Sequence, residues 1–329
     1  MRAGRTAFDL HFRKEAPVPM RIVFMGTPEF AVPSLTALFE AGYEIVAVFT
    51  QPDKPVGRKQ ILTPPAVKVE AQRLGLPVYQ PETFKNRACE PLLRELAPEL
   101  IVVVAYGKIL PRHVLTLPVH GCINLHGSLL PKYRGAAPIQ WSIINGDAQS
   151  GVTTMYLASG VDTGDMILSA ATPIGEYETY GELHDRLAVL GAPLLVETVR
   201  RIEQGSAPRT PQDEAQASYA PMLDKTISRL DFSKPARQLS KLICGTNPWP
   251  VANTLYEGKL LKVYAALVGG PSTAEPGFAV QHADGICVAC GDETSLLLTE
   301  VQLEGGKRMG AAQFLAGHPM KEPVLLGEG

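Results

Sequence analysis

The stretch RIVFMGTPEFAVPSLTALFEAGYEIVAVF, residues 21–49, decides the fold. It opens with an apolar run from Ile22 to Met25 and closes with a second one from Ile45 to Phe49. Between them, apolar residues recur at helical spacing up to Gly42, and glycine is a common residue at the end of a helix. A strand, a helix and a strand in this order predict a parallel sheet covered by helices on both faces.

The same alternation continues to about residue 205. A helix is expected to begin after Thr179, which forms a capping-box pattern with Glu182, and to be kinked or broken at Pro193. The other expected helices are Ala66 to Leu74 and Cys89 to Leu96, and the other expected strands are Leu100 to Ala105, Cys122 to Leu125, Thr153 to Leu157 and Met166 to Ala170. Residues 21–205 are therefore predicted to form one α/β domain.

The chain changes character after residue 205. Residues 206–225 are rich in proline, alanine and polar residues without a sustained period, and we interpret them as a linker. Within residues 226–329, a helix is expected around Ala236 to Ile243, followed by short strands separated by turns that contain glycine. Such strands predict a second, smaller domain that is a barrel or a sandwich.

Composition limits the cellular setting. The apolar runs are far shorter than the roughly 20 residues that cross a bilayer. The five cysteines are scattered and odd in number, which favours a reducing, cytoplasmic compartment, and the Cys287/Cys290 pair lacks the second pair that a metal site needs. Residues 1–20 have no signal-peptide core; we expect a disordered extension, with a start at Met20 or an organellar targeting segment as alternatives.

The residues GCINLHGSLLPKYRGAAPIQ, 121–140, carry the clearest chemical signal. Asn124 and His126 are two apart on an expected strand, so their side chains share a face at its carboxyl end, where open α/β sheets bind ligands. An amide and an imidazole side by side can donate to an oxygen that gains negative charge in acyl transfer. Taken alone, the pair is better explained as a capped turn with a hydrogen-bonded histidine.

Residues 121–140, together with SGVTTMYLASGVDTGDM, 150–166, resemble the signature of the 10-formyltetrahydrofolate-dependent formyltransferases. The resemblance implies a Rossmann-like catalytic domain, an OB-like barrel after it, and no metal. It implies that Asn124, His126 and Asp162 are catalytic, and that the folate lies against a loop made of Ser128, Leu129, Leu130 and Pro131. Asp165 has a competing claim, but we expect it to tie the turn to a backbone amide.

The acceptor of the formyl group is indicated by other motifs, which resemble the branch of this family that formylates methionine on initiator Met-tRNA. These motifs are RIVFMGTPEFAVPSL at 21–35, FTQPDKPVGRKQ at 49–60 and NPWP at 247–250. In that branch the loop matching Lys54, Arg58 and Lys59 contacts the RNA, and the second domain binds RNA phosphates. In this chain the prolines and Gly57 are expected to keep the loop irregular. Alternatives are an enzyme acting on an amino sugar, a glycinamide ribonucleotide transformylase, which is shorter, and a noncatalytic RNA-binding protein.

Three further expectations concern binding and assembly. Gly26-Thr27-Pro28 lacks the later glycines of a dinucleotide fingerprint, so a nicotinamide cofactor is not expected. A basic face is expected between Arg229 and Lys262, formed by Arg229, Lys234, Arg237, Lys241, Lys259 and Lys262. Trp249 is expected to pack in a core, and the protein is expected to be a monomer without a membrane partner.

Overall fold

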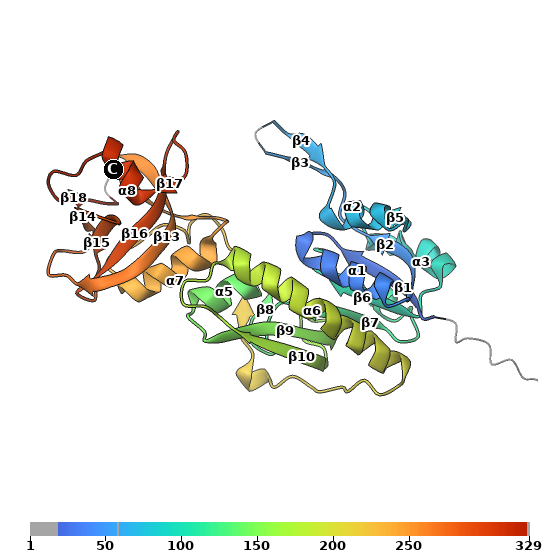
Figure 1. The fold of residues 1–329 in the computed structure, drawn as a ribbon. Helices are drawn as coiled ribbons and strands as arrows, with labels where there is room; N and C mark the ends of the chain where they lie inside the picture. Colours follow the sequence, from blue (N-terminus) through green and yellow to red (C-terminus); the bar gives the residue numbers. More distant parts are fainter. Residues whose placement is uncertain (1–18, 58, 328–329) are drawn as a thin grey trace, which may run out of the picture.

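The computed structural model describes residues 19–57 and 59–327, and its N-terminal part is built on one seven-stranded sheet (Figure 1). The strand order is β10-β9-β7-β6-β1-β2-β5, in which β7 to β5 run parallel and β9 and β10 are antiparallel additions at one edge. The expected α/β class with a mostly parallel sheet is confirmed. The strands are β1 (Arg21–Gly26), β2 (Glu44–Phe49), β5 (Val78–Tyr79), β6 (Leu100–Val104), β7 (Cys122–His126), β9 (Gln149–Tyr156) and β10 (Met166–Pro173).

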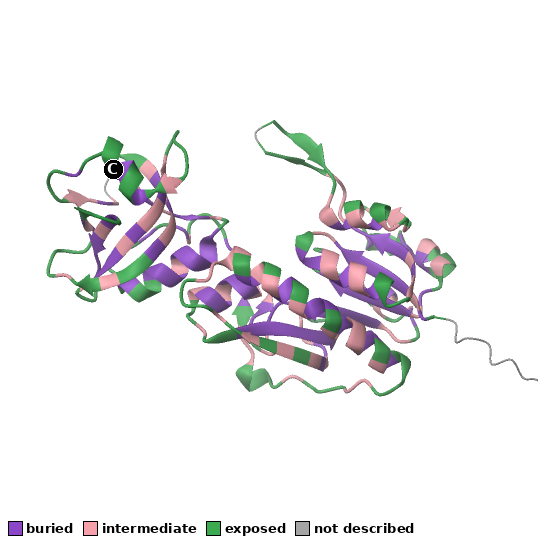
Figure 2. Cartoon of the chain, viewed as in Figure 1, coloured by how far each residue is buried: buried purple, intermediate pink, exposed green. Residues whose placement is uncertain are grey.

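Helices cover both faces of this sheet because its strands are apolar on both sides (Figure 2). In β1, Ile22 and Phe24 enter one core and Val23 and Met25 enter the other, as the two-residue period of a strand requires. The first core includes residues of α1 (Val32–Glu40), α2 (Ala66–Arg73), α5 (Pro138–Ile144) and α6 (Tyr180–Glu203), preceded by the short η1 (Glu29–Ala31). The second core includes residues of α3 (Glu90–Leu96) and α4 (Arg112–Leu115), with η2 (Lys85–Arg87) before α3.

Helix α6 is the longest helix in the described part of the chain. The Thr179 hydroxyl accepts from the Glu182 N–H, and the Glu182 carboxylate accepts from the Thr179 N–H, so the predicted capping box is present. The prediction of a break at Pro193 is wrong, because the helix continues through it. Leu187 and Leu195 are buried on either side of this proline, and their packing offsets its missing N–H.

The segment that follows α6 lies along the N-terminal part of the molecule. It contains η3 (Glu214–Gln216) and β11 (Tyr219–Ala220), and β11 pairs in parallel with β8 (Arg134–Gly135). Gly135 is required there, since its φ is 116° and a Cβ would lie 2.8 Å from the Ala220 carbonyl oxygen.

The C-terminal part is a curled antiparallel sheet that forms a half-barrel, consistent with the expected OB-like domain. The strand order is β12-β13-β16-β15-β14-β18, and β17 pairs with β16. Strand β13 changes register between Val263 and Ala265 and again before Pro271; such bulges let a long strand bend. The elements are α7 (Ala236–Thr246), β12 (Ala252–Tyr256), β13 (Lys259–Pro271), β14 (Phe278–His282), β15 (Gly285–Ala289), β16 (Thr294–Leu303), β17 (Met309–Gly310), α8 (Ala311–Gly317) and β18 (Val324–Leu325).

The two parts meet where α7 packs against α5 (Figure 1). Close approach depends on Gly245, since a Cβ there would lie 2.5 Å from Ile144 Cγ1. Gln140 Nε2 donates to the carbonyl oxygen of Trp249 at 3.0 Å. Trp249 itself is 50% exposed, so the prediction that it packs in a core is wrong: its backbone, rather than its ring, makes this contact.

Within the described ranges, no helix combines the length and the apolar composition that a membrane crossing requires.

Candidate active site

Asn124 and His126 lie at the end of β7, which runs between β6 and β9 near the middle of the sheet. Their side chains share a face, as predicted from their spacing, and both residues are buried, with 9% and 5% of their surface exposed. Polar side chains at this position lie at the carboxyl edge of the parallel strands, where open sheets of this type bind ligands. An amide and an imidazole therefore lie two residues apart at the end of β7.

The imidazole of His126 is held by a backbone carbonyl. Its Nε2 lies 2.8 Å from the carbonyl oxygen of Tyr133. A carbonyl only accepts, so Nε2 carries a proton and donates it. Nδ1 lies 3.6 Å from Asp162 Oδ2, and this nitrogen is the one that can exchange a proton or gain positive charge beside the carboxylate. The Tyr133 contact could not be predicted from residue types, because any residue supplies a carbonyl.

Asp162 comes from the turn between β9 and β10 and has a φ of 53°, in the left-handed region. Its Oδ2 accepts a hydrogen bond of 2.8 Å from the N–H of Gly135. The same oxygen thus faces both the backbone of β8 and the ring of His126. The structure thus places Asp162 beside His126, and Asn124 lies two residues before His126 on β7; these are the three residues that the sequence singled out.

Asn124 is 9% exposed, and no hydrogen bond of its side-chain amide occurs within residues 19–57 and 59–327, although this amide is not among the fully buried groups that lack a partner there. Buried polar groups in proteins are nearly always paired. An amide that its own chain leaves free at a strand end is available to donate to a bound oxygen.

The loop that follows His126 is fixed by Thr153 of β9. The Thr153 hydroxyl donates to the Ser128 carbonyl oxygen at 2.7 Å and accepts from the Leu130 N–H at 3.2 Å. Ser128 is 1% exposed, and its hydroxyl donates to the Lys132 carbonyl oxygen at 2.6 Å. The loop is therefore rigid, and the Ser128 hydroxyl is engaged within it. Sequence reasoning missed Thr153, whose signal was a polar residue on the strand paired with His126.

Asp165, the second acid of the same turn, has a different environment. Its carboxylate lies 3.8 Å from Nη1 of Arg209, and the Arg209 guanidinium stacks on the ring of Tyr156. In the described part of the chain no backbone N–H donates to this carboxylate, so the expected capping contact is replaced by an ion pair with Arg209.

The predicted RNA-contacting loop is a hairpin rather than an irregular loop. Strands β3 (Lys54–Val56) and β4 (Ile61–Thr63) pair antiparallel and project away from the sheet (Figures 1 and 2). Lys54 and Lys59 are exposed, whereas Arg58 lies outside the described residues. The hairpin also exposes apolar side chains, those of Val56, Ile61 and Leu62.

A polar cluster holds the base of this hairpin. Lys68 Nζ of α2 donates to both carboxylate oxygens of Asp53 at 2.8 Å and to Gln80 Oε1 at 2.9 Å. Gln80 Nε2 donates in turn to Asp53 Oδ1 and to the Gln51 carbonyl oxygen, each at 2.8 Å. The hydrogen bonds from Lys68 and then Gln80 lower the pKa of Asp53.

The expected basic face of the second domain is only partly exposed. Lys234, Arg237 and Lys259 are exposed, but Lys241 is 9% exposed and its ammonium donates to the Glu176 carbonyl oxygen at the junction of the two parts. Lys241 therefore belongs to the junction, and its inclusion in a phosphate-binding face is wrong.

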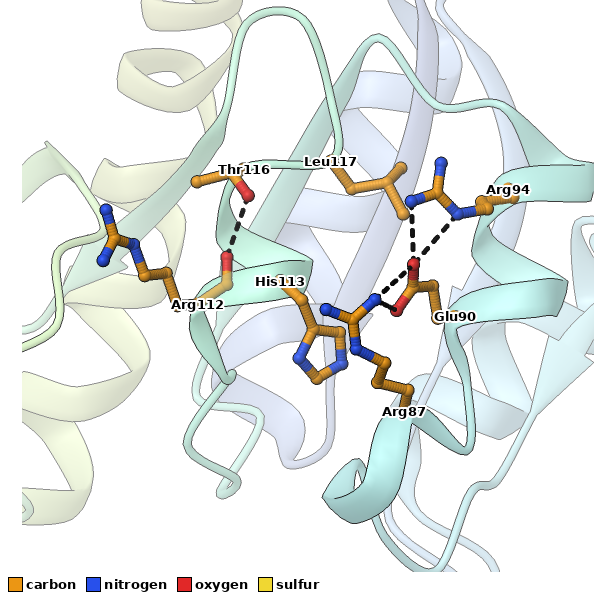
Figure 3. Close-up of a pocket in the computed structure, with 7 residues that line it drawn as sticks. All are labelled: Arg87, Glu90, Arg94, Arg112, His113, Thr116 and Leu117. Carbon is orange, nitrogen blue, oxygen red and sulfur yellow. Dashed lines mark hydrogen bonds and ion pairs between the residues drawn. The ribbon is translucent and has the colours of Figure 1, made fainter.

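A hollow of about 520 Å³ lies between α3 and α4 and shares no residue with the site at β7 (Figure 3). Glu90 occupies it and pairs with both Arg87 and Arg94. The hydrogen bond from Arg94 lowers the pKa of Glu90. The negative charge of the Glu90 carboxylate offsets the positive charges of the two arginines. The hollow therefore holds a surface ion-pair network around Glu90, and His113 also lines it.

Cys287 and Cys290 of the second domain differ in burial. No cluster of three or more potential ligands occurs in residues 19–57 and 59–327. Cys290 is buried, and burial raises its pKa to about 12, so it has little thiolate character.

Comparison with known proteins defines the class. The model of the family described as formyl transferase matches residues 20–199, and that described as formyl transferase, C-terminal domain, matches residues 222–319. The chain is therefore a member of the formyltransferases. It is 49% identical over 94% of its length to a methionyl-tRNA formyltransferase of Pelotomaculum thermopropionicum, covering 99% of that protein, and to one of Acetivibrio thermocellus, covering 100%. The chain belongs to the methionyl-tRNA formyltransferase family.

Solved structures share its fold at lower identity. An N-formyltransferase from Helicobacter canadensis, solved with folinic acid and dTDP-3-aminofucose, superposes with a TM-score of 0.66 at 19% identity, covering 85% of this chain and 98% of that one. HypX from Aquifex aeolicus has a TM-score of 0.63 at 15% identity, covering 91% of this chain and 48% of that one.

Proposed function

We propose that the chain transfers the formyl group of 10-formyltetrahydrofolate to the α-amino group of methionine on initiator Met-tRNA. The observation that carries the proposal is the meeting of Asn124, His126 and Asp162 at one end of β7 in a chain of this family. These groups are a free amide donor, an imidazole with its Nε2 proton already engaged, and a carboxylate beside Nδ1.

The chemistry sets the role of each group. The neutral α-amine attacks the formyl carbon, forming the new N–C bond and an oxyanion; an α-amine, with a reference pKa near 8, is partly neutral at pH 7. The free amide of Asn124 donates to this oxyanion. The amine then loses a proton, directly or through water, to the Asp162 carboxylate. The oxyanion re-forms the carbonyl as the bond from carbon to N10 breaks, and N10 takes up this proton from Asp162, directly or through water.

His126 contributes its charged form. With Nε2–H engaged by Tyr133, a proton on Nδ1 makes the ring an imidazolium beside Asp162. An imidazolium next to the oxyanion stabilises it. The Asp162 carboxylate lies 3.6 Å from Nδ1, so this arrangement depends on the position of Asp162 relative to the ring.

The folate co-substrate is proposed to lie against the loop of Ser128, Leu129, Leu130 and Pro131. The Thr153 hydroxyl and the internal bond of Ser128 support a rigid wall that contacts the folate through backbone groups and the Leu129 side chain rather than through the Ser128 hydroxyl. No metal ion takes part in the proposed reaction.

The acceptor RNA is proposed to contact the hairpin through Lys54, Arg58 and Lys59, and the second domain through its exposed basic residues. An exposed hairpin with cations and apolar side chains at its end can contact both phosphates and unpaired bases. Replacing Arg58 by alanine should weaken transfer to Met-tRNA more than uncoupled hydrolysis of the folate; equal losses would show a structural role for the hairpin.

We further propose that the protein acts as a monomer in the cytoplasm, the compartment in which charged initiator tRNA is used. Size-exclusion chromatography with light scattering measures the first of these properties.

One assay tests the acceptor. Purified protein is incubated with 10-formyltetrahydrofolate and, in parallel, with charged initiator Met-tRNA, elongator Met-tRNA or a nucleotide-linked amino sugar. We expect formylated product with initiator Met-tRNA and little with the others. Formylation of the amino sugar in its place would identify the chain as a sugar N-formyltransferase, and no transfer to any amine would overturn the proposal.

A further inference from the structure

The turn that carries Asp162 is held by a residue from far along the chain. The side-chain amide of Gln212 donates to the carbonyl oxygens of Asp162 and Gly164, both at 2.8 Å. The turn needs such support because Asp162 has a left-handed φ of 53°, a conformation that is unfavourable for a non-glycine residue. Gln212 therefore stabilises the backbone conformation that aims the carboxylate at His126.

Arg134 fixes Gln212 in place. Its Nε donates to Gln212 Oε1 at 2.9 Å, and its two terminal nitrogens donate to the carboxylate of Glu214 at 2.9 and 2.8 Å. The guanidinium is fully buried, and a buried charge must keep its partners. The next residue, Gly135, donates its N–H to Asp162 Oδ2. Strand β8 thus holds the Asp162 carboxylate through the N–H of Gly135, and it holds the turn through the side chain of Arg134, which fixes Gln212.

The segment that supplies Gln212 is attached along its length. At one end, Thr210 exchanges backbone hydrogen bonds with Met166, directly after the turn, at 2.8 and 3.0 Å. At the other end, the Ser218 hydroxyl accepts from the Tyr133 N–H at 2.9 Å, and β11 pairs with β8. Residues 209–220, which we name the strap, therefore lie across the turn and β8 together.

We infer that Gln212 and Arg134 are positioning residues for Asp162, and that the strap completes the active site from the segment that joins the two domains. The inference rests on the proposed role of Asp162. The strap falls between the two ranges matched by the family models, residues 20–199 and 222–319, so it lies outside both matched domains. An isolated N-terminal domain that ended before residue 209 would lack both Gln212 and Glu214.

The test compares Gln212→Leu with Gln216→Leu in the full chain. Gln216 lies in the same strap and is exposed, and its side chain donates to Asp213 rather than to the turn, so it is a matched control. We expect Gln212→Leu to lower kcat for formyl transfer by about 10- to 100-fold, because small displacements of a reacting group have effects of this size, with KM for both substrates unchanged. Gln216→Leu should match the wild type.

A double-mutant cycle with Asp162→Asn separates positioning from general damage. If Gln212 acts through Asp162, Gln212→Leu should cause no further loss of kcat in the Asp162→Asn background. Multiplicative losses in the double mutant would overturn the inference. Should Asp162→Asn itself retain wild-type kcat, the proposed role of Asp162 fails, which is a result distinct from failure of the strap.

Gln212→Glu shows whether a loss of kcat comes from the missing donors to the turn or from the missing partner of Arg134. It also replaces Gln212→Leu as the test variant if Gln212→Leu does not fold. Glutamate keeps an oxygen for Arg134 but removes the two donors to the turn. We expect a kcat loss as large as that of Gln212→Leu. Wild-type kcat in Gln212→Glu, with a thermal melt like that of the wild type, would show that Gln212 serves only as a partner for Arg134 and would overturn the inference.

Discussion

At the scale of single residues, the free amide of Asn124 is the group whose removal should affect the reaction most directly. Asn124→Ala removes a donor to the oxyanion, and one such donor is worth about 10²- to 10³-fold in rate. We expect kcat for Met-tRNA formylation and uncoupled folate hydrolysis to fall together. Thermal melting should change little, since the amide has no partner in the described chain to lose. Steady-state kinetics showing wild-type kcat would remove Asn124 from the mechanism.

Thr153 has a different role, because its hydroxyl holds the loop expected to contact the folate. Thr153→Val keeps the shape but leaves the Ser128 carbonyl and the Leu130 N–H without this partner. Buried groups left unpaired cost about 1–3 kcal/mol, so we expect lower stability and a higher KM for the folate.

The neighbouring residue provides the control for that change. Thr154 is equally buried, but its hydroxyl pairs with that of Thr198 of α6, on the opposite face of β9. Thr154→Val should therefore lower stability without changing KM for the folate. If both variants raise this KM equally, the loop is not specifically maintained by Thr153.

The side chains of the site could be predicted from the sequence, whereas the backbone groups that bond to them could not. The two-residue period of a strand predicted that Asn124 and His126 would share a face, which the structure bears out. The carbonyl of Tyr133 and the N–H of Gly135 could not be predicted, since every residue has such groups. Gln212 could not be predicted either, because its role depends on a contact across 50 positions of the sequence.

At the scale of elements, the hairpin of β3 and β4 depends on the cluster at its base. Lys68→Met removes the three hydrogen bonds that join α2 to Asp53 and Gln80. Lys68 and Gln80 lower the pKa of Asp53, so its carboxylate stays charged, and the cluster intact, at neutral and mildly acid pH. We expect a several-fold rise in KM for Met-tRNA and no change in KM for the folate.

Arg73→Met is the matched control for this change, because Arg73 lies on the same helix and pairs with Glu70 rather than with the hairpin. Its kinetic constants should stay at wild-type values. Limited proteolysis provides a second measurement: cleavage between residues 54 and 63 should accelerate in Lys68→Met alone. Equal cleavage in both variants would mean that the base of the hairpin does not depend on Lys68.

Elements differ in how well local sequence predicts them. The capping box at Thr179 fixed the start of α6, since both of its partners are within four residues. The continuation of α6 through Pro193 depends on tertiary packing of Leu187 and Leu195, which no local rule contains. The hairpin could not be predicted for a related reason. Pro55 is expected to interrupt regular structure, whereas proline is tolerated in a strand at the edge of a sheet.

At the scale of the whole molecule, a net charge of −2 conceals an uneven distribution that matters for RNA binding. Exposed cations that contact phosphates release counterions on binding, and each contact adds to the salt dependence of affinity. Buried cations do not contribute, whatever their position in the sequence. Lys259 and Lys241 belong to the same predicted face, but only the exposed Lys259 can contact an RNA phosphate.

The final prediction uses this difference. Lys259→Met should weaken binding of Met-tRNA and reduce the slope of log affinity against log salt by about one unit, as expected for one lost phosphate contact. Lys241→Met removes the bond to Glu176 at the junction of the two domains, so it should lower the melting temperature and leave the slope unchanged. Filter binding between 50 and 200 mM salt, roughly the range over which such contacts dominate, measures both slopes. An unchanged slope in Lys259→Met would exclude this residue from the RNA interface, and a reduced slope in Lys241→Met would mean that the junction opens to admit the RNA.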